Sequence, residues 1–271
     1  MGVQKGGTER PLVSAQKKGA NPSPSSGQAR GHPRLAGKVA VVTGGNRGIG
    51  LAIARAMVVE GCSVVINGRD PAALDMAKAE LAKVAMGGEV LAQTGDVRDE
   101  KAVALVFAKV KKRWGQLDVL VNNAGILQKL YDTAETPVEL WRAVLDTNLT
   151  GMFLCTRAAV PLMGRGATIV NTLSVTVRTA VPKLAAYNAS KAGALGFTDT
   201  LREELRSTGI RVTALIAGAT DTEIWEQFWP QAPREKMVRA EDVAAAVLYA
   251  VTLPPEASVN EVMLVPQKGI L

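Results

Sequence analysis

The sequence holds few of the side chains on which several enzyme classes depend. It has one histidine, His32, and two cysteines, Cys62 and Cys155, among 271 residues. Because the histidine lies near the N-terminus, a Ser-His-Asp triad or a histidine-based metal site has no imidazole in the body of the chain. Both cysteines lie in or beside apolar segments, which is typical of buried thiols rather than of a disulfide or metal ligands. We therefore expect chemistry without imidazole and without a metal.

Long apolar runs and a strongly basic body are also missing. No apolar run reaches the about 18 residues that a membrane span needs, so we expect no membrane partner. The net charge of +7 is carried mostly by residues 1–34, which hold six basic residues and one acid and leave only +2 for the rest. A nucleic-acid partner would favour a basic face on the folded part. The sequence therefore predicts no nucleic-acid partner either.

Residues 1–35 are rich in Gly, Pro and Ser and have no apolar periodicity. Such a composition buries too little apolar surface to order itself, so we interpret this segment as a flexible basic extension. It lacks the apolar core of a signal peptide, and a cytoplasmic location is expected. Two alternatives stay open: an organellar transit peptide, and a tail that binds RNA or a membrane surface.

From residue 36 onward, short apolar runs alternate with helical patterns. Strands are expected over residues 38–43, 62–68, 89–96, 117–125, 167–174, 210–218 and 259–266, and helices over 49–61, 71–85, 99–114, 137–163, 185–208 and 240–252. Continuous apolar strands are typical of a parallel sheet covered by helices on both faces. Residues 36–271 are therefore predicted to form a single-domain α/β Rossmann-like fold, a doubly wound parallel sheet in three α/β/α layers.

The first strand is joined to the first helix by a glycine-rich turn, TGGNRGIG, over residues 43–50. Gly44, Gly48 and Gly50 permit a tight turn and a close approach of the backbone to a ligand. The helix that follows directs its N-terminal amides at a phosphate group. The segment lacks the Gly-Lys-Ser/Thr of a P-loop, which disfavours a nucleoside triphosphatase. It indicates a dinucleotide site.

The end of the second strand, INGRD, indicates which dinucleotide binds. A cation at this point accepts the 2′-phosphate of NADP, whereas an acid binds the ribose hydroxyl of NAD. Arg69 lies there, Arg47 adds a second charge from the glycine turn, and Asp70 is expected to cap the next helix. We therefore predict NADP(H) in preference to NAD(H). Asp96, after the third strand, has two interpretations: a contact to the adenine amine, or a cap of the following helix.

Tyr187 and Lys191 are four residues apart in YNASK, so both leave one face of the predicted helix. A nearby ammonium lowers the pKa of a phenol, which would let Tyr187 pass a proton near neutral pH. Ser174 lies thirteen residues upstream, at the end of a strand. Together the three side chains predict a general acid and an oxyanion donor.

These motifs resemble the short-chain dehydrogenase/reductase family over residues 36–265. The family's TGxxxGxG turn, its NNAG motif at residues 122–125, its asparagine in DTNLTG, its serine and its YxxxK pair occur in order. The resemblance implies hydride transfer between a nicotinamide and a ketone or secondary alcohol. It implies Asn148, Ser174, Tyr187 and Lys191 as catalytic residues, and Gly44, Arg47, Gly48, Ile49, Gly50, Arg69, Asp96, Val97, Asn123, Tyr187, Lys191 and Thr222 as cofactor-binding residues.

Within this resemblance, Asn148 is expected to hold a water that links Lys191 to solvent, or alternatively to fix a bend in a long helix. Asn123 is expected beside the cofactor, with a purely structural turn as the alternative. The chain departs from the family at Ala217, where members usually carry proline. Alanine restrains the backbone less, so a looser nicotinamide edge is expected.

The expected activity is that of an NADPH-dependent carbonyl reductase or alcohol dehydrogenase, acting on a small-molecule substrate such as a 3-oxoacyl thioester or a 3-hydroxy acid. The alternative is a non-catalytic NADP(H)-binding sensor on the same fold. Trp225, Phe228 and Trp229 have helical spacing and are predicted either to line an apolar pocket or to pack on the domain or a partner. The resemblance also implies a homodimer or homotetramer, joined through residues 137–163 and 185–208.

Overall fold

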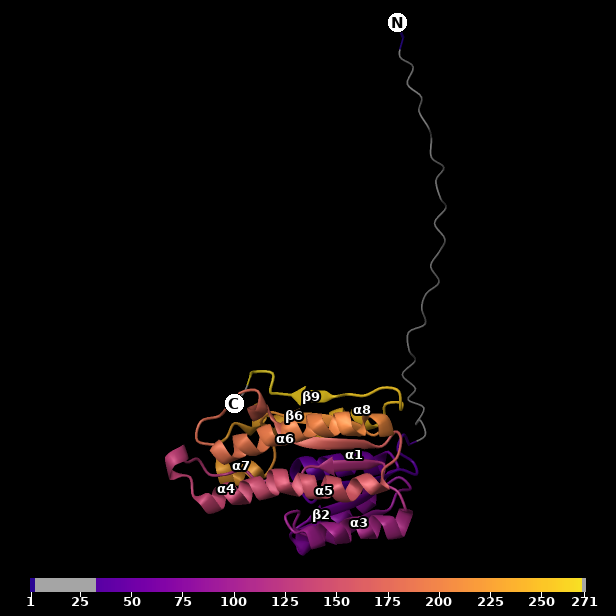
Figure 1. Cartoon of the computed structure of the whole chain (residues 1–271), viewed down its shortest axis with the longest axis horizontal. Helices are drawn as coiled ribbons and strands as arrows, with labels where there is room; N and C mark the ends of the chain where they lie inside the picture. The colour runs from indigo at the N-terminus through magenta and orange to yellow at the C-terminus, as the bar shows by residue number, and fades with distance from the viewer. Residues whose placement is uncertain (3–32, 270–271) are drawn as a thin grey trace. The chain divides into compact units, whose positions relative to one another are not determined.

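Seven apolar segments form one parallel sheet in the computed structural model, which describes residues 1–2 and 33–269 (Figure 1). Apolar residues predominate in the five inner strands, which are buried from both sides as a doubly wound sheet requires, whereas the two edge strands are partly exposed. The chain order reverses between the two central strands. In the order of the sheet, the strands are β3 (Val90–Thr94), β2 (Ser63–Gly68), β1 (Val39–Thr43), β4 (Val119–Asn122), β5 (Thr168–Ser174), β6 (Arg211–Ala217) and β9 (Glu261–Leu264).

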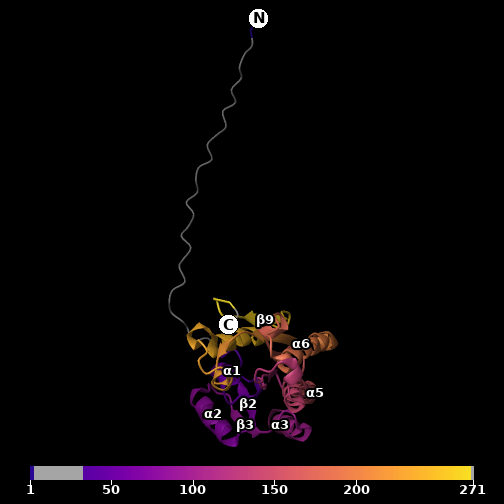
Figure 2. The same ribbon diagram turned by 90° about the vertical axis from the view of Figure 1, so that its left-hand side faces the viewer.

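Helices cover both faces of the sheet. Figure 2 shows α1 (Gly48–Val59) and α2 (Pro71–Val84) on one side, and α3 (Glu100–Trp114), α5 (Gly151–Ala159) and α6 (Ala185–Leu205) on the other. An apolar core lies on each face of the sheet, and alternate residues of β1 point into one or the other. Ala40 and Val42 pack with α1, α2 and α8 (Ala240–Val251), whereas Val39 and Val41 pack with α3, α5 and α6. The predicted fold class, a three-layer α/β/α sheet, is confirmed.

The long helix predicted over residues 137–163 is not one regular helix. It consists of α4 (Val138–Leu145), a π-helical turn (Asp146–Thr150), α5 and a 3₁₀ turn (Val160–Leu162). A second short sheet, β7 (Thr220–Asp221) with β8 (Val238–Arg239), and the helix α7 (Ile224–Phe228) follow β6. The sequence pattern predicted neither the π-helical turn nor β7 and β8.

The folded body begins slightly before the predicted boundary at residue 36. Leu35 is 3% exposed and packs in the core beside α1, its amide donates to Glu60 O at 2.9 Å, and Arg34 pairs with the Glu60 carboxylate at 2.7 Å. Residues 33–35 therefore belong with the body. The rest of the predicted extension, residues 3–32, lies outside the described residues.

Within residues 1–2 and 33–269, no helix has the length and apolar character needed to span a membrane. Cys62 and Cys155 are free and buried, as predicted. Burial raises the pKa of each thiol to about 12, so neither offers a thiolate near neutral pH.

Candidate active site

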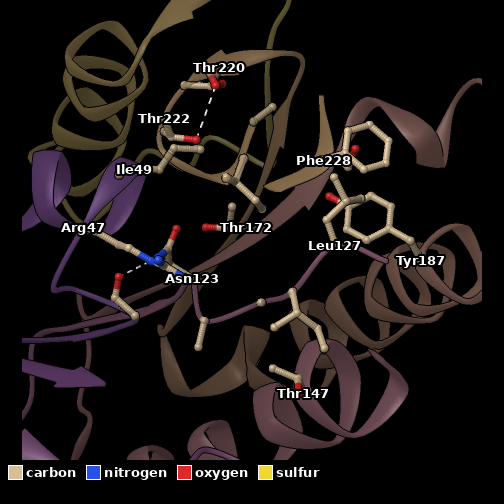
Figure 3. A pocket seen from close by; sticks show the side chains of 18 of the residues that line it. Arg47, Ile49, Asn123, Leu127, Thr147, Thr172, Tyr187, Thr220, Thr222 and Phe228 are labelled. Carbon is tan, nitrogen blue, oxygen red and sulfur yellow. Dashed lines mark hydrogen bonds between the residues drawn. The ribbon is translucent and has the colours of Figure 1, made fainter. Parts of the chain in front are cut away.

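A cleft of about 790 Å³ opens at the carboxyl ends of the parallel strands, where doubly wound sheets bind their ligands (Figure 3). It brings together most of the residues predicted from the sequence. Three of the four predicted catalytic residues line it: Ser174, Tyr187 and Lys191. Eleven of the predicted cofactor residues also line it: Gly44, Arg47, Gly48, Ile49, Arg69, Asp96, Val97, Asn123, Tyr187, Lys191 and Thr222. Gly50 and Asn148 are not part of the lining.

The glycine turn follows β1 and has the backbone that only glycine adopts readily. Gly44 and Gly48 have φ of +61° and +53°, and α1 begins at Gly48. A Cβ at Gly50 would lie 2.2 Å from Gly44 O, so the tight turn predicted there requires glycine. Gly50 therefore lets the first turn of α1 pack on the loop, and the turn presents helix amides to the cleft.

Two arginines flank this turn. Arg47 and Arg69 are exposed, line the cleft, and make no ion pair with another described residue. Asp70 caps α2 as predicted, since its carboxylate accepts from Ala72 N at 2.9 Å and Ala73 N at 3.2 Å. The end of β2 thus presents the positive charge of Arg69 to the cleft, while the Asp70 carboxylate is hydrogen-bonded to the first turn of α2.

Asp96 does not cap the helix that follows it. The cap of α3 is Asp99, which accepts from Lys101 N at 2.9 Å. Asp96 instead accepts from the Arg98 guanidinium at 2.7 Å and from Arg98 N at 2.9 Å. The hydrogen bond and charge of Arg98 lower the pKa of Asp96. Its carboxylate is therefore ionised at the cleft wall, and the capping alternative for Asp96 is wrong.

Asn123 and Thr43 tie the end of β4 to the glycine turn. Asn123 Nδ2 donates to Thr43 O at 3.1 Å and to Gly44 O at 3.2 Å, while Thr43 Oγ1 accepts from Asn123 N and Ala124 N. Asn123 also lines the cleft. It therefore both holds the turn and faces the ligand space, and the buried Thr43 is a structural partner that sequence reasoning missed.

Tyr187 and Lys191 lie on the same face of α6, as their spacing predicted. Lys191 Nζ lies 5.7 Å from the centre of the Tyr187 ring and donates to Thr172 O at 2.8 Å. Ser174, at the end of β5, lies near enough to Tyr187 that its side chain acts to lower the Tyr187 pKa. Thr172 lies two residues before Ser174 and so on the same side of β5. Because Lys191 binds the backbone carbonyl of Thr172, the side-chain pattern of the strand would not have identified this contact.

The predicted lowering of the Tyr187 pKa is wrong in this structure. Burial raises the Tyr187 pKa, and the Ser174 side chain opposes that rise only in part. Burial also lowers the pKa of Lys191 to about 8. Removal from water disfavours the charged form of both groups, and this effect outweighs their proximity.

Asn148 lies in the π-helical turn and is 1% exposed. Its Oδ1 accepts from Ile126 N at 2.8 Å, and its Nδ2 donates to Ile126 O at 3.0 Å and to Ser190 Oγ at 3.1 Å. The side-chain amide thus joins the helix to the loop after β4. A Cβ on Gly125 would lie 3.2 Å from Asn148 Oδ1 and 3.7 Å from Lys191 Nζ. Asn148 therefore lies next to Gly125 and Lys191, both of which line the cleft, but does not line the cleft itself.

Strand pairing holds the backbone at Ala217, and the predicted looseness of the nicotinamide edge stays a prediction. It is the last residue of β6, in register with Ser174 of β5 and with Leu264 of β9, and the next amide, Gly218 N, donates to Leu264 O at 2.7 Å. Farther along the same segment, Thr222 lies against the glycine turn, 3.1 Å from where a Cβ on Gly48 would stand.

The aromatic residues after β6 line the cleft, as one of the two predictions had it. The Trp225 ring packs edge to face with Phe228 at 5.8 Å and with Trp229 at 6.4 Å between ring centres. Trp225 Nε1 donates to Thr220 O at 2.8 Å, which fixes α7 to β7. In Figure 3, Phe228, Leu127 and Tyr187 lie together at one end of the cleft, and Arg47 lies at the other.

Comparison with known proteins gives a consistent picture. Residues 38–233 match the family model described as short chain dehydrogenase. A 3-oxoacyl-[acyl-carrier-protein] reductase of Synechocystis sp. is 37% identical over 83% of this chain and 94% of its own. A farnesol dehydrogenase of Aedes aegypti is 36% identical over 86% of this chain and 97% of its own.

Two solved structures have the same fold. A short chain dehydrogenase from Burkholderia cenocepacia in complex with NADP superposes with a TM-score of 0.78 at 31% identity, covering 85% of this chain and 97% of that one. An alcohol dehydrogenase from the archaeon Thermococcus sibiricus, complexed with 5-hydroxy-NADP, gives a TM-score of 0.78 at 30% identity, with 86% and 97% covered.

Proposed function

The chain belongs to the short-chain dehydrogenase family, and from this premise we propose that it is an NADPH-dependent carbonyl reductase, or an alcohol dehydrogenase in the reverse direction. One observation carries the proposal. The side chains of Ser174, Tyr187 and Lys191 line the same cleft as the glycine turn, and Lys191 Nζ lies 5.7 Å from the centre of the Tyr187 ring. A non-catalytic sensor would need the turn but not these three side chains.

The residues of the cleft fit a dinucleotide phosphate. The positive-φ glycines and the start of α1 suit the pyrophosphate, and Arg47 and Arg69 suit a 2′-phosphate. Asp70 is engaged in capping α2, so it is a poor partner for the ribose hydroxyl of NAD. Lys191 would bind the nicotinamide ribose, and Thr222 would contact the carboxamide. The structural relatives from Burkholderia and Thermococcus bind NADP or a derivative of it, which supports NADP(H).

Bound there, the nicotinamide supplies a hydride to the carbonyl carbon of the substrate. Tyr187 donates its phenolic proton to the carbonyl oxygen as negative charge develops on it, and Ser174 donates a hydrogen bond to the same oxygen. Lys191 stabilises the phenolate that remains on Tyr187. Asn148 fixes the loop behind Lys191 and would place a water that returns protons from solvent.

A ketone or secondary alcohol is the substrate class that this machinery handles. A 3-oxoacyl thioester is one candidate, because a relative is named as a 3-oxoacyl-[acyl-carrier-protein] reductase. The 3-hydroxy acid predicted from the sequence is the charged alternative. The farnesol dehydrogenase among the relatives extends the range to an apolar alcohol.

Tyr187→Phe tests the proposal. The change keeps the ring but removes the proton donor, so turnover should fall by at least about a hundredfold, while NADPH binding, followed by its fluorescence, is unchanged. The measurement is the loss of absorbance of reduced nicotinamide against a panel of carbonyl compounds. Turnover near that of the wild type in the variant would disprove the acid role. NADPH binding without turnover of any compound by the wild type would favour the sensor.

We also propose a homodimer or homotetramer joined through α4, α5 and α6. Phe153 on α5 is 42% exposed and packs edge to face with Phe197 on α6, at 6.2 Å between ring centres. An exposed phenylalanine that packs on a partly buried one of the adjacent helix is typical of a contact surface. Light scattering after gel filtration measures the number of subunits. A cytoplasmic location stays a prediction.

A further inference from the structure

We propose that the substrate is an uncharged ketone or alcohol with an apolar body, rather than a carboxylate or another anion; this inference rests on the proposed carbonyl reductase activity. It follows from the end of the cleft beyond Ser174 and Tyr187, here named the substrate chamber. Apolar side chains from four separate segments of the chain line it: Leu127, Val175, Val181, Trp225, Phe228 and Trp229.

The aromatic wall of the chamber is built as a unit. Trp225 is held by its indole hydrogen bond to Thr220 O, and Phe228 and Trp229 pack against its ring. Trp229 is nevertheless 42% exposed, so it presents apolar surface to whatever enters the cleft. A large exposed aromatic surface inside a concave site is stabilised by covering it with apolar ligand atoms.

The charged residues that line the cleft lie at its nucleotide end or at the catalytic pair. Arg47, Arg69 and Asp96 follow the first three strands, and Lys191 lies beside Tyr187. Glu223 lies at the glycine turn, 3.6 Å from where a Cβ on Gly48 would stand. The charged residues of the described lining are Arg47, Arg69, Asp70, Asp96, Lys191 and Glu223, and none of them is part of the aromatic wall.

Cations of the neighbouring loops do not reach the chamber. Arg178 is paired with Glu261 at 2.6 Å and Lys183 with Asp132 at 3.4 Å, and neither Arg178 nor Lys183 lines the cleft. An anionic group on the substrate would therefore enter an apolar space without a counter-charge. Removing an unpaired carboxylate from water is strongly unfavourable, whereas a methyl group at the same place gains free energy.

Matched ketones separate charge from size. 2-Octanone and 7-oxooctanoate differ only in a terminal methyl or carboxylate, and methyl 7-oxooctanoate restores neutrality while keeping the oxygens. Acetophenone, 4-acetylbenzoate and methyl 4-acetylbenzoate repeat the comparison on a ring. With NADPH, we expect kcat/KM for each neutral ketone and ester to exceed that for the carboxylate by about a hundredfold.

A carboxylate reduced as fast as its ester would overturn the inference and leave the reductase proposal standing. Oxidation of NADPH with none of the six compounds, while NADPH still binds, would overturn both. Trp229→Lys adds a direct check. A cation on the aromatic wall should reduce the ratio of kcat/KM for the ester to kcat/KM for the carboxylate at least about tenfold. The matched control is Tyr249→Lys, which also replaces an exposed aromatic by lysine but lies on α8, outside the cleft. It should leave this ratio of kcat/KM values unchanged.

Gln128 carries a second, independent inference. We infer that it is a positioning residue for Tyr187, acting through the backbone of α6. Gln128 is 1% exposed in the loop after β4, and its Oε1 accepts from Tyr187 N at 2.9 Å. Tyr187 is the third residue of α6, where the amide has no acceptor within the helix, and the residue before the helix, Leu184, gives no side-chain cap.

The other end of the Gln128 amide holds the preceding loop. Its Nε2 donates to Lys183 O at 3.3 Å, and Tyr131 N donates to the same oxygen at 3.1 Å. Lys183 has φ of +67°, the only positive φ outside glycine among the described residues, so its conformation needs such support. One buried side chain thus sets both the entry into α6 and the first turn that aims Tyr187 at Ser174.

Gln128→Met keeps the size of the side chain but removes both hydrogen bonds. We expect kcat to fall about tenfold with the Kd of NADPH unchanged, since a small misplacement of the donor slows proton transfer. The pH at which alcohol oxidation is half-maximal should also rise, because the effect of the Ser174 side chain that lowers the Tyr187 pKa is weakened. A purely structural role would lower Tm but leave this pH unchanged.

Gln116→Met is the matched control, since Gln116 bonds Asp118 at the opposite end of the sheet. Hydrogen exchange of the wild-type Tyr187 amide tests the same inference without a variant. That amide should be protected by at least about tenfold relative to an uncapped first-turn amide. Fast exchange at Tyr187, or a Gln128→Met enzyme with wild-type kcat and pH profile, would overturn the inference.

Discussion

At the scale of single residues, the site is governed by burial more than by attraction between Tyr187 and Lys191. Burial raises the pKa of the tyrosine and lowers that of the lysine to about 8. The tyrosine therefore keeps its proton throughout the neutral range, as a proton donor for carbonyl reduction must. The lysine, in contrast, loses its charge within the range that an assay can reach.

The pH dependence of reduction follows from these directions. A lysine whose pKa has fallen to about 8 is charged below that pH and neutral above it. Because the ammonium stabilises the phenolate left on Tyr187, kcat for reduction should be constant between about pH 6 and 7 and fall through about pH 8. A profile of kcat at saturating NADPH measures this. A rate that stays flat to pH 10 would show that the charge of Lys191 does not matter.

Arg69 is the residue whose charge should decide the choice of cofactor. Arg69→Asp replaces a cation at the end of β2 by an acid, so the affinity for NADPH should fall about a hundredfold and that for NADH should change little or improve. Titration of both nucleotides by fluorescence gives the two Kd values. Arg206→Asp, at an exposed position after α6, controls for the general change of charge. Equal losses for both nucleotides would contradict the 2′-phosphate role.

At the scale of elements, the sequence predicted the regular pieces well and the irregular ones poorly. Apolar runs and helical spacing identify strands and helices locally, and the glycine, serine and YxxxK motifs identify the cleft. The π-helical turn at Asn148 depends on bonds to Ile126, which is 22 residues away, so no local pattern predicts it. Gln128 escaped notice for the same reason, since its partners Tyr187 and Lys183 are distant in sequence.

The joint between the loop after β4 and the π-helical turn can be tested at Gly125. Gly125→Ala would place a methyl group 3.2 Å from Asn148 Oδ1 and 3.7 Å from Lys191 Nζ. That crowding should displace both groups and lower kcat about tenfold with a smaller effect on Tm.

Gly196→Ala on α6 is the matched control, because nothing lies within 4 Å of its added methyl. It should keep kcat and raise stability by about 0.5–1 kcal/mol. A wild-type kcat in Gly125→Ala would count against tight packing behind Lys191.

At the scale of the whole molecule, the sheet and its covering helices follow from the alternation of apolar runs along the chain. The start of the folded body was less predictable, because Pro33, Arg34 and Leu35 adjoin a segment rich in Gly, Pro and Ser. What adds them to the body is contact with residues about 25 positions later, at Glu60 and Gly61. Composition alone cannot detect such contacts.

Two truncations test this boundary. A chain that starts at Pro33 keeps the Leu35 side chain in its core and should unfold at the Tm of the full chain. A chain that starts at Gly37 loses that burial and the Arg34–Glu60 pair, and its unfolding free energy should fall by about 2–4 kcal/mol. Thermal unfolding of both measures the difference. Equal Tm values would show that residues 33–36 contribute nothing to the body.

The stretch from Thr220 to Trp229 touches both ends of the cleft. Thr222 rests on the glycine turn, and seven residues later Trp229 forms part of the aromatic wall. A nucleotide that settles on the turn therefore meets the same short stretch that receives the carbonyl compound. We therefore expect a substitution within residues 220–229 to change both the affinity for the dinucleotide and the turnover of the carbonyl compound.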